Sequence, residues 1–313
     1  MEEPWERPIG RNVGRAINDE SALDRYVAFL LKAVTTNLDG IKVVVDCANG
    51  AASKAAPMAL KAAGAEVIAI ANQPDGWNIN EGVGSTHLDF LKKNVLEHQA
   101  DIGIAHDGDA DRCLAIAADG SEIDGDQILA ILTMGLIERN QLKSNTVVAT
   151  VMSNLGFLKA MESAGIKVLT TPVGDRCVLE KMLAEDLTIG GEQSGHIINR
   201  QFANTGDGIL TALQILQEMA RTKKSLKDLV AVMQRFPQVL INVKEVDKER
   251  LPASAAIKTA VKNAESELGN AGRVLLRASG TENLVRVMVE ASSDNLAHKI
   301  ANDLVKVVKA ELG

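Results

Sequence analysis

The chain has 313 residues, a formal net charge of −7 and 46% hydrophobic residues. This length exceeds one ordinary hydrophobic core and predicts two or three domains. A 24% share of charged residues is typical of a folded globular protein. The sequence has no stripe of lysine and arginine, which argues against a nucleic-acid surface. It also has no apolar run of the roughly 18 residues that span a membrane.

The cysteines, Cys47, Cys113 and Cys177, lie far apart and form no CxxC pair. Such cysteines are typical of reduced, structural thiols in a cytosolic protein. The opening MEEPWERPIG is too acidic and polar for a signal peptide. We therefore expect a cytoplasmic protein.

The first 123 residues predict a linker followed by an α/β unit. Residues 1–19 carry prolines and glycines without periodicity and predict an extended linker from another part of a protein. Residues 20–34 predict an amphipathic helix. The continuous apolar run IKVVVDCANG (41–50) predicts a buried parallel strand. A helix through Leu60 and a strand in residues 63–70 follow.

A second strand–turn–helix–strand unit follows the pattern of the first. NTVVATVMSN (145–154) leads into a helical stretch and then AGIKVLTT (164–171). Both units read as apolar strand, asparagine at the turn, helix, Ala-Gly and strand. We interpret them as a duplicated α/β domain.

The pattern changes near Pro237. Residues 237–246 predict a strand, residues 254–268 a helix, and residues 273–277 and 285–290 two strands. Asp294 is expected to cap a last helix. The sequence thus predicts two related three-layer α/β domains plus a small α+β domain with an antiparallel sheet. The boundaries are a linker at 1–19 and domains at 20–123, 124–236 and 237–313.

The strongest chemical signal is HDGDADR, residues 106–112, directly after the apolar strand ADIGIA. Asp107, Asp109 and Asp111 alternate, and three carboxylates so close repel one another unless a hard divalent cation lies between them. An EF-hand is excluded because Arg112 and Ala118 stand where its glycine and glutamate are required. The alternatives are a cation site, with Arg112 supplying a phosphate contact, and a solvated acidic turn.

Two further loops carry groups suited to sugars and phosphates. GGEQSGH (190–196) offers Glu192, Ser194 and His196, and a carboxylate that accepts from vicinal hydroxyls is how proteins hold sugars. A glycine-rich turn capped by Glu192 is the alternative. RASGTEN (277–283) reads as a phosphate cradle or as an ordinary hairpin turn. Its proposed phosphate ligands are Arg277, Ser279, Gly280 and Thr281, and Arg286 in the following strand faces either the same anion or solvent.

A fourth loop, PVGDRCV (172–178), follows a predicted strand. Its two charged residues, Asp175 and Arg176, either reach the substrate or pair with each other.

These loops, in this order, resemble the α-D-phosphohexomutase superfamily. In that superfamily a DGDGDR-type loop binds magnesium, a GE-x-SG-type loop grips sugar hydroxyls, and an R-x-SGT-type loop binds the substrate phosphate. The resemblance runs from about Arg7 to the end of the chain and corresponds to the second to fourth of four domains. It is most similar to the bacterial phosphoglucosamine mutase branch, on GEQSGH, VVDCANGA, VGDR, NTGDGI and RVLLRASGTEN.

Among the departures from the superfamily pattern, two bear directly on the chemistry. Ala110 stands where glycine is usual in the metal loop, so a positive φ there would matter. The T-x-S-H-N-P loop, whose serine is phosphorylated in the superfamily's first domain, does not occur in the 313 residues. We therefore expect the chain alone to be catalytically incomplete.

The resemblance implies an intramolecular phosphotransferase that interconverts glucosamine 6-phosphate and glucosamine 1-phosphate. It implies one Mg²⁺ per chain on the three aspartates, Arg112 beside the transferring phosphoryl group, and a sugar 1,6-bisphosphate as activator or intermediate in the full enzyme. A hexosamine phosphate is the expected substrate, and a separate phosphoserine domain or a homodimer the expected protein partner. The alternatives are a phosphomannomutase/phosphoglucomutase and a non-catalytic sugar-phosphate-binding truncation.

Overall fold

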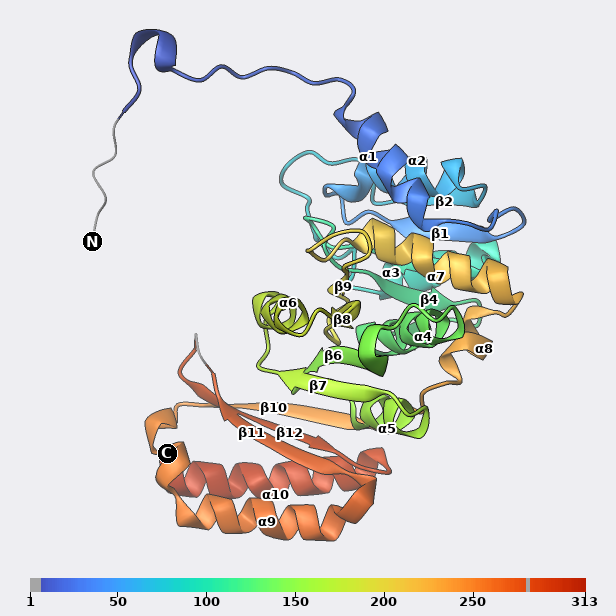
Figure 1. The fold of residues 1–313 in the computed structure, drawn as a ribbon. Helices are drawn as coiled ribbons and strands as arrows, with labels where there is room; N and C mark the ends of the chain where they lie inside the picture. Colours follow the sequence, from blue (N-terminus) through green and yellow to red (C-terminus); the bar gives the residue numbers. More distant parts are fainter. Residues whose placement is uncertain (1–6, 280–281) are drawn as a thin grey trace.

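The computed structural model describes residues 7–279 and 282–313. Residues 7–20 run away from the body of the molecule, and Ile9 and Ile17 are exposed. The remaining described residues form three sheets flanked by helices (Figure 1). None of the helices in the described ranges has the length and apolar character required to cross a bilayer.

The first unit is a five-stranded sheet in the order β2-β1-β3-β4-β5. The strands β1 to β3 are parallel and β4 and β5 are antiparallel additions. Helix α3 covers one face through its contacts with β1, β3 and β4, while α1 and α2 belong to the other face. The elements are α1 (Ala22–Leu30), β1 (Lys42–Asp46), α2 (Ala52–Ala62), β2 (Glu66–Ile70), α3 (Asp89–His98), β3 (Ile102–Ala105), β4 (Leu114–Ala117) and β5 (Glu122–Ile123).

The second unit repeats this topology with the sheet order β7-β6-β8-β9. Its β6, β7 and β8 are parallel and β9 is antiparallel to β8, as β4 is to β3. This common topology confirms the predicted duplication. The elements are α4 (Gly125–Glu138), β6 (Thr146–Thr150), α5 (Leu155–Ser163), β7 (Lys167–Thr171), α6 (Asp175–Ala184), β8 (Ile189–Gly191), β9 (Ile197–Asn199), α7 (Gly208–Thr222) and α8 (Leu226–Val230).

The C-terminal residues form an antiparallel sheet in the order β10-β12-β11, with two helices packed against it. The predicted α+β domain is thus confirmed. The predicted cap of the last helix is wrong. Ser293 is the N-cap, because its extended backbone lets its hydroxyl accept from the Leu296 amide, whereas Asp294 is already helical. The elements are β10 (Gln238–Lys244), α9 (Ala255–Leu268), β11 (Arg273–Ala278), β12 (Leu284–Glu290) and α10 (Asp294–Leu312).

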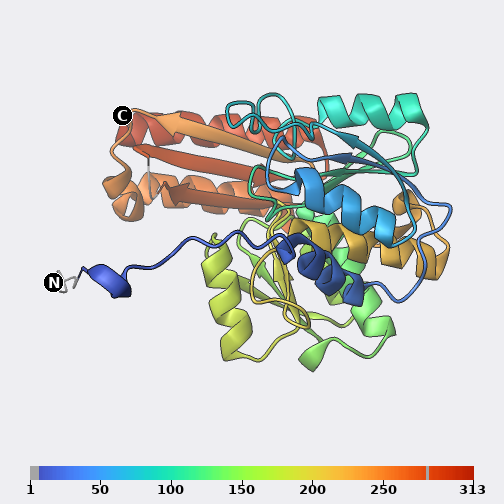
Figure 2. The ribbon, with the colours of Figure 1, turned by 90° about the horizontal axis from the view of Figure 1, so that it is seen from above.

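The two α/β units share one hydrophobic core. The same buried cluster includes Leu60 of α2, Leu129 of α4, and Leu213 of α7. Helix α7 contacts α1 and α2 of the first unit as well as α4, and Figure 2 shows it between the two units. The C-terminal domain has a separate core around Val287 and Leu304.

A buried polar network joins the C-terminal domain to the second unit. Glu290 is fully buried, and its carboxylate accepts from Arg273 Nε at 2.6 Å and from the Leu155 amide at 2.9 Å. The Asn154 carboxamide donates to Glu290 and exchanges two hydrogen bonds with the Phe236 backbone. These bonds fix the point where the chain leaves the second unit and enters β10.

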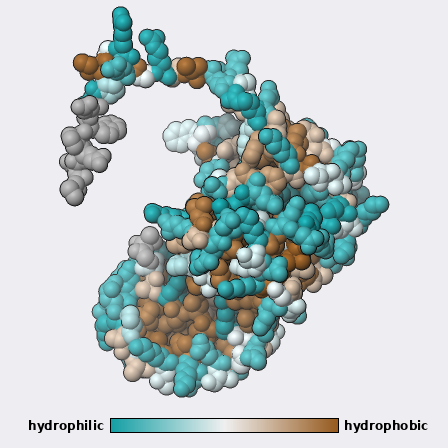
Figure 3. Space-filling view, viewed as in Figure 1, coloured by the Kyte–Doolittle hydropathy of each residue, from teal (hydrophilic) through white to brown (hydrophobic). Residues whose placement is uncertain are grey.

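Strand β11 is an edge of the C-terminal sheet, and a groove of about 590 Å³ runs between it and α9. Figure 3 shows apolar side chains gathered on this domain between the sheet and its helices. The apolar residues of the groove include Leu251, Ile257, Val261, Val274 and Leu276.

Candidate functional site

Two of the predicted loops occupy equivalent places in the duplicated units. The metal loop (His106–Arg112) joins β3 to β4, and the sugar loop (Gly190–His196) joins β8 to β9. In both cases the chain leaves a parallel strand and returns antiparallel to it. The carboxyl ends of the parallel strands therefore present both loops, which is where α/β sheets bind ligands.

The three aspartates of the metal loop point toward a common centre. Asp107, Asp109 and Asp111 each offer one carboxylate oxygen, and these oxygens lie within 4.8 Å of one another. Arg112 Nε lies 3.4 Å from Asp107 Oδ2 and 3.7 Å from Asp111 Oδ1. The guanidinium is partly exposed, so it flanks the carboxylates without enclosing them.

The electrostatics of this cluster suit a hard cation. Asp107 is buried, and its burial together with the Asp111 carboxylate raises the pKa of Asp107. The buried Asp111 Oδ1 has no hydrogen-bond partner among the described residues. A divalent ion with oxygen ligands would satisfy this oxygen and relieve the repulsion. The donor set therefore fits magnesium.

The loop after β1 packs against the metal loop. The Ala51 amide donates to the Gly108 carbonyl, and a Cβ on Gly50 would lie 2.2 Å from that carbonyl oxygen, so only glycine fits at position 50. Buried Asp46 accepts from the Ala48 and Gly84 amides. The sequence indicates the turn at Asn49-Gly50 but not its contact with the metal loop.

The metal and sugar loops are bonded directly to each other. The Cys113 amide donates to the Gly195 carbonyl at 3.0 Å, and Arg112 forms an isolated β-bridge with His196. His196 Nδ1 lies 3.0 Å from Asp111 Oδ2, while its Nε2 accepts from the Gly206 amide. The imidazole predicted to bind substrate is thus buried against a predicted metal ligand, with both ring nitrogens bonded.

The other predicted sugar ligands are Glu192 and Ser194, which precede His196 in the sugar loop. Glu192 Oε1 accepts from the Gly174 amide at 2.9 Å, which ties the sugar loop to the loop before α6. Ser194 is exposed at the tip of the turn. Gln193 donates to Gln238 at the start of β10, so this loop also touches the C-terminal domain.

The loop before α6 places its charged residues at the helix start. Asp175 is the first residue of α6, and Arg176 pairs with Glu180 one turn further at 2.7 Å. The expected alternative of a pair between Asp175 and Arg176 is therefore wrong, because helical geometry brings residues four apart together. A substrate contact by either residue stays a prediction.

Two arginines lie side by side on the two strands that flank the predicted phosphate turn. Arg277 of β11 is paired in register with Arg286 of β12. Partial burial and the neighbouring Arg286 lower the pKa of Arg277. Arg286 has Glu282 at 3.4 Å, whereas Arg277 makes no ion pair within the described ranges. Two adjacent guanidiniums, of which only Arg286 has a carboxylate partner in the described ranges, favour an anion.

A lysine outside the turn between these strands bonds to its backbone. Lys248 Nζ donates to the Ser279 carbonyl at 2.8 Å and to the Glu282 carbonyl at 3.0 Å, a role that no pattern in the sequence indicates. The Ser279 hydroxyl accepts from the Glu282 amide. The predictions for Gly280 and Thr281 lie outside the described residues.

Sequence comparison identifies three successive domains of one family. Phosphoglucomutase/phosphomannomutase domain II matches residues 24–120, domain III residues 124–236, and the C-terminal domain residues 240–307. The chain is 56% identical over 310 residues to phosphoglucosamine mutase of Streptomyces coelicolor, covering 99% of this chain and 69% of that one. The chain belongs to the phosphoglucomutase/phosphomannomutase family. Phosphoglucosamine mutase of Thermobifida fusca is 57% identical over 303 residues, which are 97% of this chain and 68% of that relative.

Solved structures of this family share the fold. A phosphoglucomutase/phosphomannomutase family protein from Burkholderia thailandensis superposes with a TM-score of 0.77 at 22% identity. The match covers 92% of this chain and 64% of that one. Aspergillus fumigatus N-acetylphosphoglucosamine mutase, in complex with GlcNAc-6P and magnesium, gives a TM-score of 0.72 at 20% identity over 91% of this chain and 68% of that one. This chain therefore spans about two thirds of the length of these proteins.

Proposed function

We propose that this chain supplies the metal, sugar and phosphate sites of a phosphoglucosamine mutase, which interconverts glucosamine 6-phosphate and glucosamine 1-phosphate. The observation that carries the proposal is the direct bonding between the three-aspartate loop and the sugar loop. The names of the relatives that are 55–57% identical support the amino-sugar substrate.

In this proposal the domain boundaries follow the three ligand groups. Residues 20–123 bring the metal loop, residues 124–236 the sugar loop, and residues 237–313 the phosphate loop, with residues 1–19 as a linker. Asp107, Asp109 and Asp111 would hold one Mg²⁺, which when bound neutralises charge on the transferring phosphoryl group. Arg112, beside these carboxylates, would contact the same group.

The sugar and the second phosphate would lie between the sugar loop and the arginine pair. Glu192 keeps Oε2 for sugar hydroxyls because Oε1 is bonded to the Gly174 amide. Ser194 is exposed for the same purpose. Arg277 and Arg286 would bind the phosphate that does not react, since a planar guanidinium matches phosphate oxygens. A sugar 1,6-bisphosphate would be the intermediate, because the same sites must accept either end of the sugar.

No phosphoryl donor is identified among the described side chains of this site. The 313 residues contain no T-x-S-H-N-P sequence, and of the serines in the loops Ser194 is exposed while Ser279 is bonded within its turn. We therefore propose that these residues bind the substrate and metal but do not by themselves interconvert the two phosphates. A coupled assay of the 313-residue chain with sugar 1,6-bisphosphate tests this. Robust turnover that a serine substitution within these residues abolishes would contradict it.

The metal assignment is tested by calorimetry with Mn²⁺. Asp109→Asn removes one carboxylate and should weaken binding at least about tenfold, because hard cations depend on charged oxygen ligands. Glu97→Gln, on the exposed face of α3, is the matched control and should bind as the parent does. Equal binding by all three proteins would refute the metal site.

The phosphate assignment has its own test with glucosamine 6-phosphate. Arg277→Ala should weaken binding by about 1.5–3 kcal/mol, the range for a charge-assisted hydrogen bond. Arg250→Ala removes an exposed arginine elsewhere in the same domain and should have no effect. If Arg277→Ala binds as tightly as Arg250→Ala, the turn between β11 and β12 is not a phosphate site.

A further inference from the structure

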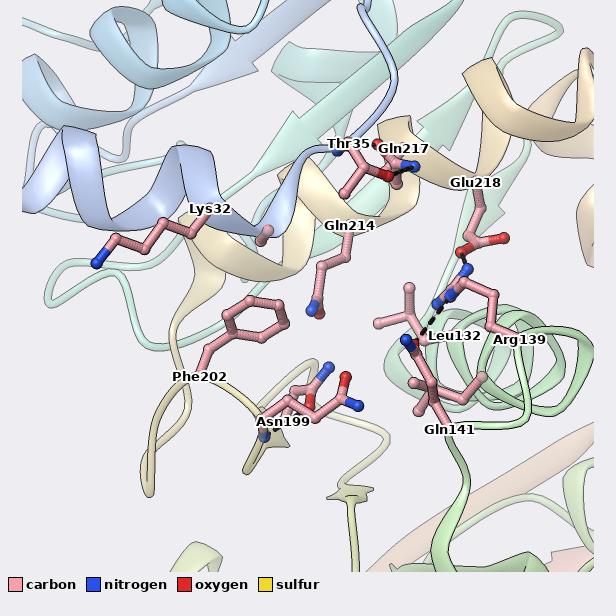
Figure 4. A pocket seen from close by; sticks show the side chains of 13 residues that line it. Lys32, Thr35, Leu132, Arg139, Gln141, Asn199, Phe202, Gln214, Gln217 and Glu218 are labelled. Atoms are coloured by element: carbon pink, nitrogen blue, oxygen red, sulfur yellow. Dashed lines mark hydrogen bonds and ion pairs between the residues drawn. The ribbon is translucent and has the colours of Figure 1, made fainter.

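A second polar cavity lies apart from the three loops. It has a volume of about 310 Å³ and is lined by the turn after α1, by α4, by α7, and by the segment that follows β9 (Figure 4). None of the described residues of the metal, sugar and phosphate loops lines it. This volume is at the lower end for ligand pockets and matches a monosaccharide-sized molecule.

Carboxamides dominate the polar lining, and two of them have free hydrogen-bonding groups. Gln214 is 8% exposed, and its amide points into the cavity without a hydrogen bond to any other described residue. Asn199 is 4% exposed; its Oδ1 accepts from the Gln201 amide, and its Nδ2 is left without an acceptor in the described ranges. Buried amide groups in protein interiors normally have a hydrogen-bond partner, so these two groups are available to a ligand.

Several of the remaining polar groups of the cavity are paired with groups of the lining or next to it. Gln217 accepts from the Thr35 and Thr36 amides and donates to both hydroxyls. Arg139 pairs with buried Glu218 and donates through Nε to Gln141 at 3.1 Å. The buried charges of the lining, Arg139 and Glu218, are therefore compensated. Lys32 makes no ion pair within the described ranges, and in Figure 4 its ammonium group points away from the Gln214 and Asn199 amides.

The lining also offers an aromatic surface. Phe202 is half-buried, and in Figure 4 its ring lies next to the Gln214 amide and above Asn199. A ring face packs against the C–H face of a sugar, while amides donate to and accept from its hydroxyls. The Gln214 and Asn199 amides favour a neutral ligand, because the ammonium group of Lys32 points away from them and Arg139 is paired with Glu218.

We propose that this cavity binds a neutral polyhydroxylated molecule of monosaccharide size. The carboxamides of Gln214 and Asn199 bind its hydroxyl groups, and Phe202 packs against its apolar face. The cavity is separate from the sugar loop and from the arginine pair proposed to bind phosphate. Its ligand therefore needs no phosphate group.

The test uses unphosphorylated N-acetylglucosamine and glucose as probes in a saturation-transfer NMR titration of the 313-residue chain. Gln214→Leu should weaken the binding of the better probe by about tenfold or more, the loss expected for buried hydrogen bonds. Glu192→Ala, in the sugar loop, should leave this binding unchanged. A crystal soaked with the same probe should show it between Gln214 and Phe202.

The unfolding temperature of Gln214→Leu shows whether a loss of binding comes from the missing amide or from a damaged fold. Gln214→Leu should unfold at the parent's temperature or higher, because an unpartnered buried amide is replaced by an apolar side chain of similar size. If this variant does not fold, Phe202→Leu takes its place and should also weaken binding. The proposal is overturned if neither probe binds the parent chain, if Gln214→Leu or its replacement binds as the parent does, or if Glu192→Ala alone abolishes binding.

Discussion

At the scale of single residues, Ala110 shows how a local conformation is set by the loop around it. Its φ is +62°, in the left-handed region that a Cβ disfavours. Its amide donates to the Asp107 carbonyl and its carbonyl accepts from the Gly208 amide, so the metal loop and the start of α7 hold this conformation together. These two hydrogen bonds therefore hold Ala110 at a positive φ, although alanine prefers a negative φ.

Ala110→Gly should stabilise the fold by about 1 kcal/mol, because glycine takes the left-handed conformation without strain. Urea unfolding measures the change. Ala118→Gly, in an exposed turn outside the positive-φ region, is the control and should destabilise by about 0.5–1 kcal/mol. A loss of stability in both variants would show that Ala110 carries no strain.

At the scale of the elements, the start of α4 places a buried carboxylate beside the interdomain network. Asp126 accepts from the Asn154 amide at 2.7 Å and is fully buried. Burial, together with the nearby Asp124 carboxylate, raises the pKa of Asp126 to about 7, and Glu290 adds to the repulsion. The folded state therefore holds a proton here that the unfolded chain releases near pH 4.

Because the pKa of Asp126 is raised on folding, its contribution to stability is complete below about pH 4 and is lost as the pH rises through 7. Asp126→Asn keeps the acceptor without the charge. It should be more stable than the parent by roughly 2–4 kcal/mol at pH 8, with the difference closing toward pH 4. Urea unfolding across this pH range measures it. A difference that does not change with pH would refute the buried charge.

The pair of Glu290 and Arg273 is the second prediction at this scale. Glu290→Gln leaves the Arg273 guanidinium partly buried without its carboxylate and should cost about 3–5 kcal/mol, as breaking buried ion pairs does. The control is Glu267→Gln, whose exposed pair with Lys299 should contribute at most about 1 kcal/mol. Chemical unfolding compares the two. Equal losses would mean that burial of the Glu290 pair is unimportant.

At the scale of the whole molecule, the arrangement of the cores predicts how the chain unfolds. One core runs through both α/β units, whereas the C-terminal domain has its own. Leu213→Ala in α7 should cost about 2–5 kcal/mol and speed hydrogen exchange in both α/β units, because α7 packs on both. Val287→Ala should speed exchange mainly in residues 238–312. Exchange that rises in only one α/β unit on Leu213→Ala would contradict a shared core.

The strands and the site loops could be predicted from the sequence, because each depends on a pattern of residues that are close together in the chain. Continuous apolar runs such as residues 41–50 predicted parallel strands, and the alternating aspartates predicted converging carboxylates. The bond between His196 and Asp111 could not be predicted, since 85 residues separate them and no spacing rule joins them. Nor could the roles of Lys248 and Gly50, which depend on carbonyl groups brought near by folding.

The sequence by itself determined the order of the elements, the duplication, and the chemistry of the loops, because hydrophobic periodicity and residue type act locally. Only the tertiary structure decided that the metal and sugar loops occupy equivalent strand connections and bond to each other, and that α7 is shared by both units. It also decided that Glu290 anchors the C-terminal domain at Asn154. The physical reason is that these contacts join segments distant in sequence, and their geometry is fixed only when the sheets have packed and water has left the core.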